Sequence, residues 1–300
     1  MKEKLVSTKK KKYKDILFEV KDQVAWITIN RPRVMNAFRE QSLDEMIEAV
    51  KSTREDPSIA CIVFQGAGNQ AFSAGGDFYA MKRLTFTNAA MWNDRMLGLA
   101  MAIRGVPIPV IAKVNGWCMG GGHELALWCD LVIASEKSML GQTGAKVGAC
   151  PTVGATQYLP RIIGERLARE MIFLARRFSA AEAEKIGLIN KCVPEDKLDE
   201  DTLAWCETIK GHSSQTIRMT KKSLNMESDQ LYGSWQQGME LLAHVWGSEE
   251  SLEGMNAFLE GRKPDFQKFR LRNKAALEEY LDGFHRHLNA PPDMRNFPED

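Results

Sequence analysis

Apolar residues are spaced in two different ways along the chain, and the change divides it into two halves. In the first half, short apolar and β-branched runs predict strands at 16–20, 24–29, 59–64, 110–114 and 131–134. The polar stretch 21–23 between the first two runs predicts an antiparallel hairpin. Helical spacing occurs between the later strands, at 42–50, 87–104 and 120–129. This alternation predicts an α/β unit with parallel strand pairing.

From Glu165 onward, helical spacing replaces the strand patterns. Helices are predicted at 165–175, 180–185, 199–210, 214–224, 231–245, 252–260 and 274–287. The chain contains no internal repeat and no Gly/Ser linker. We therefore expect a lysine-rich mobile arm over 1–12, an α/β core over 13–199, a helical region over 200–270, and a C-terminal extension over 271–300 made of a helix and a Pro-rich tail.

Composition excludes several classes of protein. With 44% hydrophobic residues, 26% charged residues and a formal net charge of +1, the chain is neither disordered nor a nucleic-acid binder that depends on bulk charge. No stretch approaches the ~20 apolar residues that span a bilayer, and the charged start lacks the apolar run of a secretory signal. The six cysteines are scattered and the histidines form no HExxH motif. We expect a cytoplasmic protein without a metal site.

Three glycine clusters occur in the first half of the chain. The first, at 66–71, formally matches GxGxxA, but no helix follows it directly, so a dinucleotide site is rejected. The other two clusters, at 74–77 and 115–124, each end in an acidic residue, Asp77 and Glu124. The N–H groups of such loops can hold an oxyanion, and two loops that converge would polarise a carbonyl group. Tight turns at backbone crossings are the alternative interpretation.

These segments carry a family resemblance that extends over 13–269. The motifs resemble the crotonase (enoyl-CoA hydratase/isomerase) superfamily in the stretches 71–77, 115–126, 129–131, 141–142, 160–164 and 180–187. The resemblance implies an α/β fold with a crotonase-like ββα spiral core and a C-terminal helical region. It also implies that the region 200–270 takes part in oligomerisation, as a homotrimer or hexamer.

An acyl-CoA thioester is the substrate class that the resemblance implies, with no separate cofactor. The thioester carbonyl would accept hydrogen bonds from the N–H groups of Gly76 and Gly121. Contacts to CoA are implied at Asn36, Ala37, Phe38, Arg39, Ala74, Gly75, Asp77 and Phe78, and at Lys263 from a neighbouring subunit. Arg39 and Lys263 are suited to phosphate, although a lone basic residue is more often a solvated surface charge.

Glu124 is the candidate catalytic residue. It matches the first of two glutamates that activate water in hydratases of the superfamily, whereas a helix N-terminal carboxylate is the structural alternative. The second glutamate is absent, because Thr143 and Gly144 follow Gln142 at the matching place. Ordinary β-oxidation hydratases and the isomerases that place their base at this second position are therefore disfavoured. His123, the residue before Glu124, is expected to pack inside the protein or against another subunit.

Three further segments resemble a branch that acts on alicyclic rings. The stretches 35–39, 141–148 and 261–266 resemble dihydroxynaphthoyl-CoA synthase and 2-ketocyclohexanecarboxyl-CoA hydrolase. Those enzymes carry Ser-x-Asp where this chain has Ala149, Cys150 and Pro151, and a tyrosine where it has Trp246. The stretch 144–160 resembles 6-oxocyclohex-1-ene-1-carbonyl-CoA hydrolase, which also has a glutamate after the triple glycine.

Hydration of an unsaturated, cyclic acyl-CoA is the function that this combination favours, with Glu124 activating water. The acyl pocket is expected to include Tyr79, Trp117, Gly144, Cys150, Pro151, Val153 and Trp246, with Trp92 as a further aromatic candidate. One alternative is a ring-opening C–C hydrolase or a ring-forming synthase acting on a β-keto cyclic acyl-CoA. A less favoured alternative is a non-catalytic relative that binds RNA through lysines 9–12. We expect neither a nucleic-acid nor a membrane partner.

Overall fold

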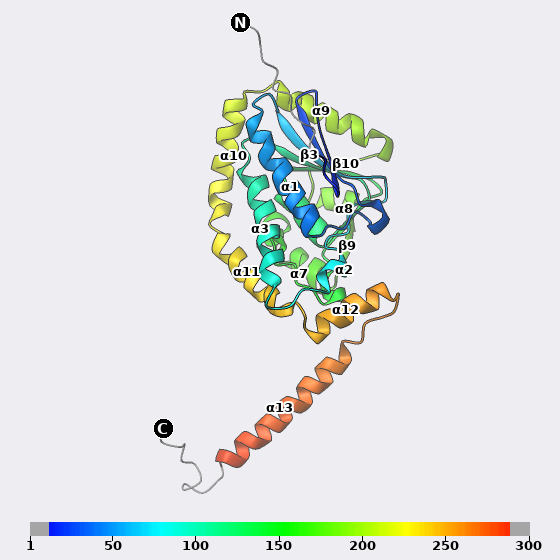
Figure 1. The fold of residues 1–300 in the computed structure, drawn as a ribbon, viewed down its shortest axis with the longest axis vertical. Coiled ribbons are helices and arrows are strands. Elements are labelled where there is room, and N and C mark those ends of the chain that lie inside the picture. The colour runs from blue at the N-terminus through cyan, green and yellow to red at the C-terminus, as the bar shows by residue number, and fades with distance from the viewer. Residues whose placement is uncertain (1–11, 289–300) are drawn as a thin grey trace.

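The computed structural model describes residues 12–288 and contains two sheets (Figure 1). The larger sheet has the strand order β1-β2-β3-β5-β7-β10, and only its β1–β2 pair is antiparallel. Its strands are β1 (Ile16–Lys21), β2 (Val24–Ile29), β3 (Cys61–Gly66), β5 (Val110–Val114), β7 (Leu131–Ser135) and β10 (Lys191–Val193). The predicted hairpin is confirmed, and each later strand predicted for the first half has a counterpart here.

A second sheet of four very short strands was not predicted from the sequence. Its order is β4-β6-β8-β9, with parallel pairing except between β8 and β9. The strands are β4 (Ala71–Ser73), β6 (Trp117–Met119), β8 (Met139–Gly141) and β9 (Arg177–Ser179). Three residues are too few to show a period of two, and this explains why the pattern missed them. From β3 to β8, successive strands alternate between the two sheets.

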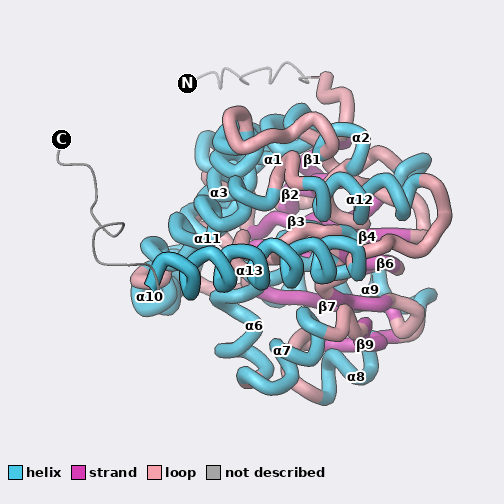
Figure 2. The backbone as a smooth tube through the Cα atoms, turned by 90° about the horizontal axis from the view of Figure 1, so that it is seen from below, coloured by secondary structure: helices cyan, strands magenta, loops and turns pink. Residues whose placement is uncertain are grey.

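Helices cover the sheets and make up most of the C-terminal half. The long ones are α1 (Glu40–Ser52), α3 (Ala89–Gly105), α4 (Gly121–Trp128), α6 (Ala155–Ile163), α7 (Glu165–Phe173), α9 (Leu198–Lys210), α10 (Ser214–Asp229), α11 (Tyr232–Val245), α12 (Glu249–Leu259) and α13 (Gln267–Leu288). The short ones are α2 (Phe78–Met81), α5 (Gly144–Val147) and α8 (Ala180–Lys185). Figure 2 shows the strands in the interior, between α1 and α3 on one side and α7 and α8 on the other.

Helix α6 is a second element that the pattern missed, because Pro160 lies inside it. A proline removes one backbone hydrogen bond from a helix interior, so the sequence argued against a helix there. The repeated order of two strands and a helix, as in β3-β4-α3 and β5-β6-α4, confirms the predicted α/β spiral with a helical C-terminal region. It also brings the ends of β4 and β6 together.

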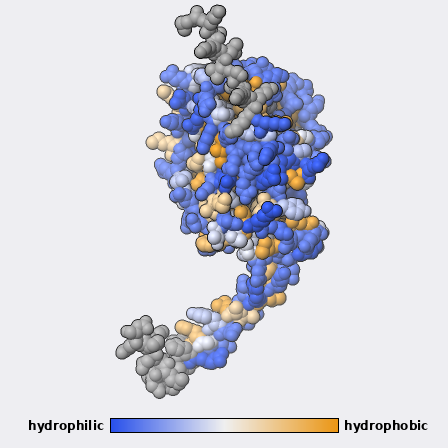
Figure 3. Space-filling model, viewed as in Figure 1, coloured by the Kyte–Doolittle hydropathy of each residue, from blue (hydrophilic) through white to orange (hydrophobic). Residues whose placement is uncertain are grey.

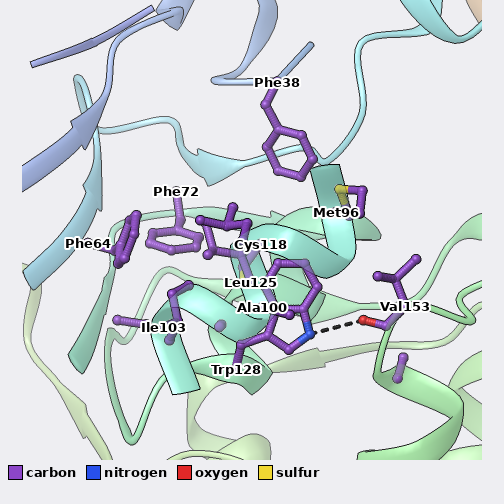
Figure 4. Close-up of a cluster of buried hydrophobic side chains, with 14 of the residues drawn as sticks. Phe38, Phe64, Phe72, Met96, Ala100, Ile103, Cys118, Leu125, Trp128 and Val153 are labelled. Carbon is purple, nitrogen blue, oxygen red and sulfur yellow. Dashed lines mark hydrogen bonds between the residues drawn. The ribbon is translucent and has the colours of Figure 1, made fainter. Parts of the chain in front are cut away.

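A continuous apolar core joins the sheets to the surrounding helices (Figure 4). Phe64 of the larger sheet and Phe72 of the smaller sheet are both fully buried. Leu125 and Trp128 of α4 lie in the same cluster, together with Met96 of α3. Because α4 has buried side chains on most of its surface, it is fixed in position at the centre of the molecule.

Helix α13 extends away from the rest of the protein as a single straight segment (Figures 1 and 3). Near its start Phe269 is buried, whereas the large apolar side chains beyond it are exposed: Leu271, Leu277, Tyr280, Leu281 and Phe284. It begins seven residues earlier than the 274–287 predicted from the pattern. The predicted arm (1–12, apart from Lys12) and Pro-rich tail (289–300) lie outside the described residues. Within 12–288, no helix is long and apolar enough to cross a membrane.

The core makes a direct prediction for stability. Leu99 of α3 is fully buried, whereas Leu224 of α10 is 73% exposed. Leu99→Ala should lower the free energy of unfolding by about 2–5 kcal/mol, since it removes buried methyl groups and leaves a cavity. Leu224→Ala, the matched control, should change it by less than about 0.5 kcal/mol. Urea denaturation of the two variants checks this, and equal effects would contradict the described packing.

Candidate active site

Two glycine-containing loops meet at the carboxyl ends of neighbouring parallel strands, β4 and β6. The loop after β4 is also held by Phe38, whose N–H donates to the Gly75 carbonyl at 2.8 Å and whose carbonyl accepts from the Asp77 N–H at 2.9 Å. Three chain segments far apart in sequence are thereby brought together around Gly76 and Gly121.

Glycine is required where these backbones approach each other. Gly75 has a φ of +93°, and a Cβ atom there would lie 2.8 Å from the Gly121 nitrogen. A Cβ atom on Gly122 would lie 2.3 Å from the Ser73 carbonyl oxygen. Side chains at these positions would therefore force the two loops apart. Among the described residues, neither the Gly76 nor the Gly121 N–H has a protein acceptor. Both are free to donate to a ligand.

Glu124 lies in the same first turn of α4 as Gly121, and only 4% of it is exposed. Its Oε1 accepts hydrogen bonds from the Val153 N–H at 2.9 Å and the Ala155 N–H at 3.3 Å. Burial raises the pKa of the Glu124 carboxyl from 4.5 to about 8, although the two N–H groups favour the charged form. A carboxyl with this pKa can exchange protons near neutral pH.

Trp128, one helical turn after Glu124, also holds the segment around Val153. Its indole N–H donates to the Val153 carbonyl oxygen at 2.9 Å, as the dashed line in Figure 4 shows. A Cβ atom at Gly154, where φ is +119°, would lie 2.6 Å from the indole nitrogen. The polar groups on both sides of Val153 are thus bonded to α4.

One cavity of about 70 Å³ brings the two loops, Glu124 and the Val153 segment together. Of the residues predicted to form the site, it is lined by Phe38, Gly76, Trp92, Gly121, Glu124, Gly144, Cys150, Pro151, Val153 and Trp246. The sequence reasoning missed the lining residues Met81, Met96, Gln142 and Leu242, whereas Gly120 belongs to the predicted glycine cluster and Ala149 to the segment singled out beside Cys150. Helical spacing could have indicated two of them, because Met96 and Leu242 are four residues from Trp92 and Trp246.

Two predicted pocket residues do not line this cavity. Tyr79 is 66% exposed on α2. Trp117 lies in the smaller sheet, where the Arg177 guanidinium stacks over its ring at 5.2 Å. His123 also lies outside the cavity lining, and burial lowers its pKa to about 4, so it is neutral near pH 7. This agrees with the packing role expected for it.

The polar residues predicted to contact CoA already have protein partners. The Asn36 amide bonds the backbone at Arg31, Ala67 and Ala71. The Arg39 guanidinium forms two hydrogen bonds with the Asp15 carboxylate, at 2.8 and 2.9 Å. These contacts fix the shape of the Phe38 segment.

Asp77 is similarly engaged, since it accepts from Arg31 at 2.8 Å and caps α2 through the Tyr79 N–H. Phe78 packs edge-on against Phe258, and Ala37 is buried. Ala74 and Lys263 are exposed. Contact of these residues with CoA stays a prediction.

Comparison with known proteins agrees with this geometry. Residues 19–269 match the family model described as enoyl-CoA hydratase/isomerase. The chain belongs to the enoyl-CoA hydratase/isomerase family. The matched region lies within the 13–269 over which the motifs resemble the crotonase superfamily, and the family assignment confirms that resemblance.

Solved structures of this family share the fold. An enoyl-CoA hydratase/isomerase from Xanthobacter autotrophicus Py2 is 30% identical, with 83% of this chain and 94% of that chain covered and a TM-score of 0.77. An enoyl-CoA hydratase from Bacillus anthracis is 31% identical, with coverages of 84% and 99% and a TM-score of 0.69. One from Mycobacterium avium subsp. paratuberculosis K-10 is 26% identical, with coverages of 85% and 99% and a TM-score of 0.78.

The raised pKa of Glu124 makes stability depend on pH. In the unfolded chain this carboxyl loses its proton near pH 4.5, whereas in the folded protein it keeps the proton up to about pH 8. Wild-type stability should therefore fall as pH rises between these values. Glu124→Gln removes this contribution, so the variant should gain stability relative to wild type over the same window. Urea denaturation at pH 5, 7 and 9 measures the difference.

Glu240→Gln, at an exposed carboxylate on α11, is the matched control. Its stability should follow that of the wild type across the three pH values, because an exposed carboxylate interacts with water in both states. If the free energies of unfolding of Glu124→Gln and wild type differed by the same amount at all three pH values, the burial of an ionisable carboxyl would be contradicted.

Proposed function

We propose that the protein adds water to the carbon–carbon double bond conjugated with the thioester of a cyclic acyl-CoA. The observation that carries this proposal is the position of Glu124, a buried carboxyl beside two free backbone N–H groups in one cavity. The family of the chain supports the acyl-CoA substrate class. No other carboxyl group lines the cavity in the described part of the chain, so Glu124 is assigned both proton transfers.

In the proposed reaction, the Glu124 carboxylate takes a proton from a water molecule while the water oxygen forms a bond to the β-carbon. The electrons of the double bond move toward the carbonyl, and negative charge develops on the thioester oxygen. The Gly76 and Gly121 N–H groups stabilise that oxygen, because they lack protein acceptors. The protonated Glu124 then returns the proton to the α-carbon. The product is a β-hydroxyacyl-CoA, and the enzyme regains its initial state.

A cyclic acyl group is favoured by the part of the cavity wall formed by residues 149–151. Cavity residues Ala149, Cys150 and Pro151 offer no carboxylate or serine hydroxyl there, and Trp246 adds an apolar surface. The sequence over 144–160 resembles an enzyme that adds water to a conjugated ring thioester and then hydrolyses a ring C–C bond. The absence of a second glutamate at 143–144 separates the chain from hydratases that use two.

Mass spectrometry with a panel of CoA thioesters in ¹⁸O-labelled water tests the substrate. The panel holds crotonyl-CoA, cyclohexadienecarbonyl-CoA, 2-oxocyclohexanecarboxyl-CoA and an oxocyclohexenecarbonyl-CoA. One labelled oxygen on an intact ring is the expected product. Ring opening would replace the proposal with a C–C hydrolase. Hydration of crotonyl-CoA alone would keep the hydratase reaction but refute the cyclic substrate.

Substitution of Glu124 tests the assigned base. Glu124→Gln should lower kcat by about 10²–10⁴-fold, because an amide cannot take a proton from water. The exposed control Glu240→Gln should retain wild-type turnover. Retention of turnover by Glu124→Gln, measured with the best substrate of the panel, would show that another group activates the water.

The pH profile gives an independent test of the same residue. The ionised carboxylate is the active form of the base, and its pKa in the free protein is about 8. The value of kcat/KM should therefore rise with pH and level off above about 8. Initial rates between pH 5.5 and 9.5 measure this. A plateau already reached at pH 6 would mean that the acting base has an ordinary carboxyl pKa.

A further inference from the structure

A second and larger cavity, of about 570 Å³, lies at the other end of α3 from the active site. Trp92 and Met96, near the start of α3, line the active-site cavity, whereas Arg104 and Gly105, at its end, line the second one. Helix α10 forms the opposite wall and runs beside α3 (Figure 1). The volume is within the range of small-molecule sites, about 300–1,000 Å³. The proposed hydration does not use this cavity.

Positive charge dominates the lining. Five basic residues face a single carboxylate, Asp229; they are Arg54, Arg104, Arg218, Lys221 and Lys222. Lys221 pairs with Asp130 at 2.6 Å, and Arg104 pairs with Asp229 at 2.6 Å, so these two cations are engaged. Such a concentration of one charge in a concave surface attracts anions.

Arg218 and Lys222 are the two basic residues without a protein partner in the described chain. They are four residues apart on α10, so they lie on the same face of the helix. Both are exposed, and together they leave two cations available at the mouth of the cavity.

Two buried donors in the same lining are incompletely bonded within the protein. The Trp235 indole N–H makes no hydrogen bond in the described structure, although only 1% of this residue is exposed, and the Tyr158 hydroxyl, in a residue that is 8% exposed, has only a weak interaction with the Ser228 side chain. Their rings pack edge to face at 5.4 Å, and the Arg104 guanidinium lies 5.5 Å above the Tyr158 ring. A buried donor without an acceptor is costly, and an indole N–H can only donate. Both groups are suited to an oxygen-rich ligand.

We propose that this cavity binds the phosphate group of a small molecule. Arg218 and Lys222 supply the charge, and the Tyr158 hydroxyl donates a hydrogen bond to a phosphate oxygen. Phosphate offers several acceptor oxygens and no apolar surface, whereas the cavity also has an apolar side formed by Met101, Val106 and Pro107. A phosphate monoester with a compact apolar group fits both parts. This site is independent of the proposed hydration reaction.

Isothermal titration calorimetry with inorganic phosphate and with phenyl phosphate, in a phosphate-free buffer of low ionic strength, tests the proposal on the full chain. One site per chain is expected for phenyl phosphate. The double variant Arg218→Gln/Lys222→Gln should weaken its binding by at least about tenfold, because two charge-assisted contacts are lost. Absence of binding to wild type at millimolar ligand would overturn the proposal.

A matched control separates the site from general surface charge. Arg270→Gln/Lys274→Gln removes two exposed basic residues with the same four-residue spacing on α13. This control should leave phenyl phosphate binding within about twofold of wild type. Equal weakening by both double variants would overturn the proposal, because binding would then depend only on net charge.

Tyr158→Phe tests the buried donor separately. It should weaken phenyl phosphate binding at least about threefold, because a buried hydrogen bond to the ligand is lost. Without ligand, the variant should be about as stable as wild type, since only a weak interaction with the Ser228 side chain is removed. Unchanged binding would overturn the role of the cavity interior.

Tighter binding of phenyl phosphate than of inorganic phosphate to the wild-type protein supports a phosphate monoester, and equal binding supports free phosphate as the occupant of the same site.

Discussion

The close approach of two backbones, after β4 and after β6, is the constraint on which the site depends. Ser73 and Gly75 contact Gly121 and Gly122 at distances that leave no room for side chains. Parallel pairing of β4 with β6 places both loops at one edge of the smaller sheet, and the Phe38 bridge adds a third segment. The free N–H groups of Gly76 and Gly121 are a result of this packing, since the backbone around them is fixed by the strands and by α4.

Two backbone N–H groups make a buried carboxyl at Glu124 tolerable in the core around α4. Burial alone would disfavour the charged form strongly, but the N–H groups of Val153 and Ala155 offset part of that cost. The remaining upward shift of the pKa lowers the stability of the folded protein at alkaline pH. The same burial that lowers the free energy of unfolding gives the carboxyl a pKa at which it can accept and donate protons near neutral pH, so a gain in proton transfer costs stability at this residue.

Much of the fold, and the centre of the site, could be predicted from sequence. The β-branched runs at 24–29 and 110–114 gave strands at the expected places, and the triple glycine gave the start of α4. The smaller sheet could not be predicted, because strands of three residues show no period. The resemblance implies a CoA contact at Arg39, which stays a prediction, but the sequence does not reveal that its guanidinium bonds Asp15, 24 residues earlier in the chain. Such tertiary partners leave no local signal in the sequence.

Helix α4 holds the peptide groups on either side of Val153 through two side chains one turn apart. Glu124 accepts from the Val153 N–H, and Trp128 donates to the Val153 carbonyl. Val153 itself lines the active-site cavity. Glu124, the proposed base, therefore also sets the position of the pocket wall. Under the proposed function, substrate range and catalytic power are consequently not independent traits, and an evolutionary change at Glu124 also changes the shape that the substrate meets.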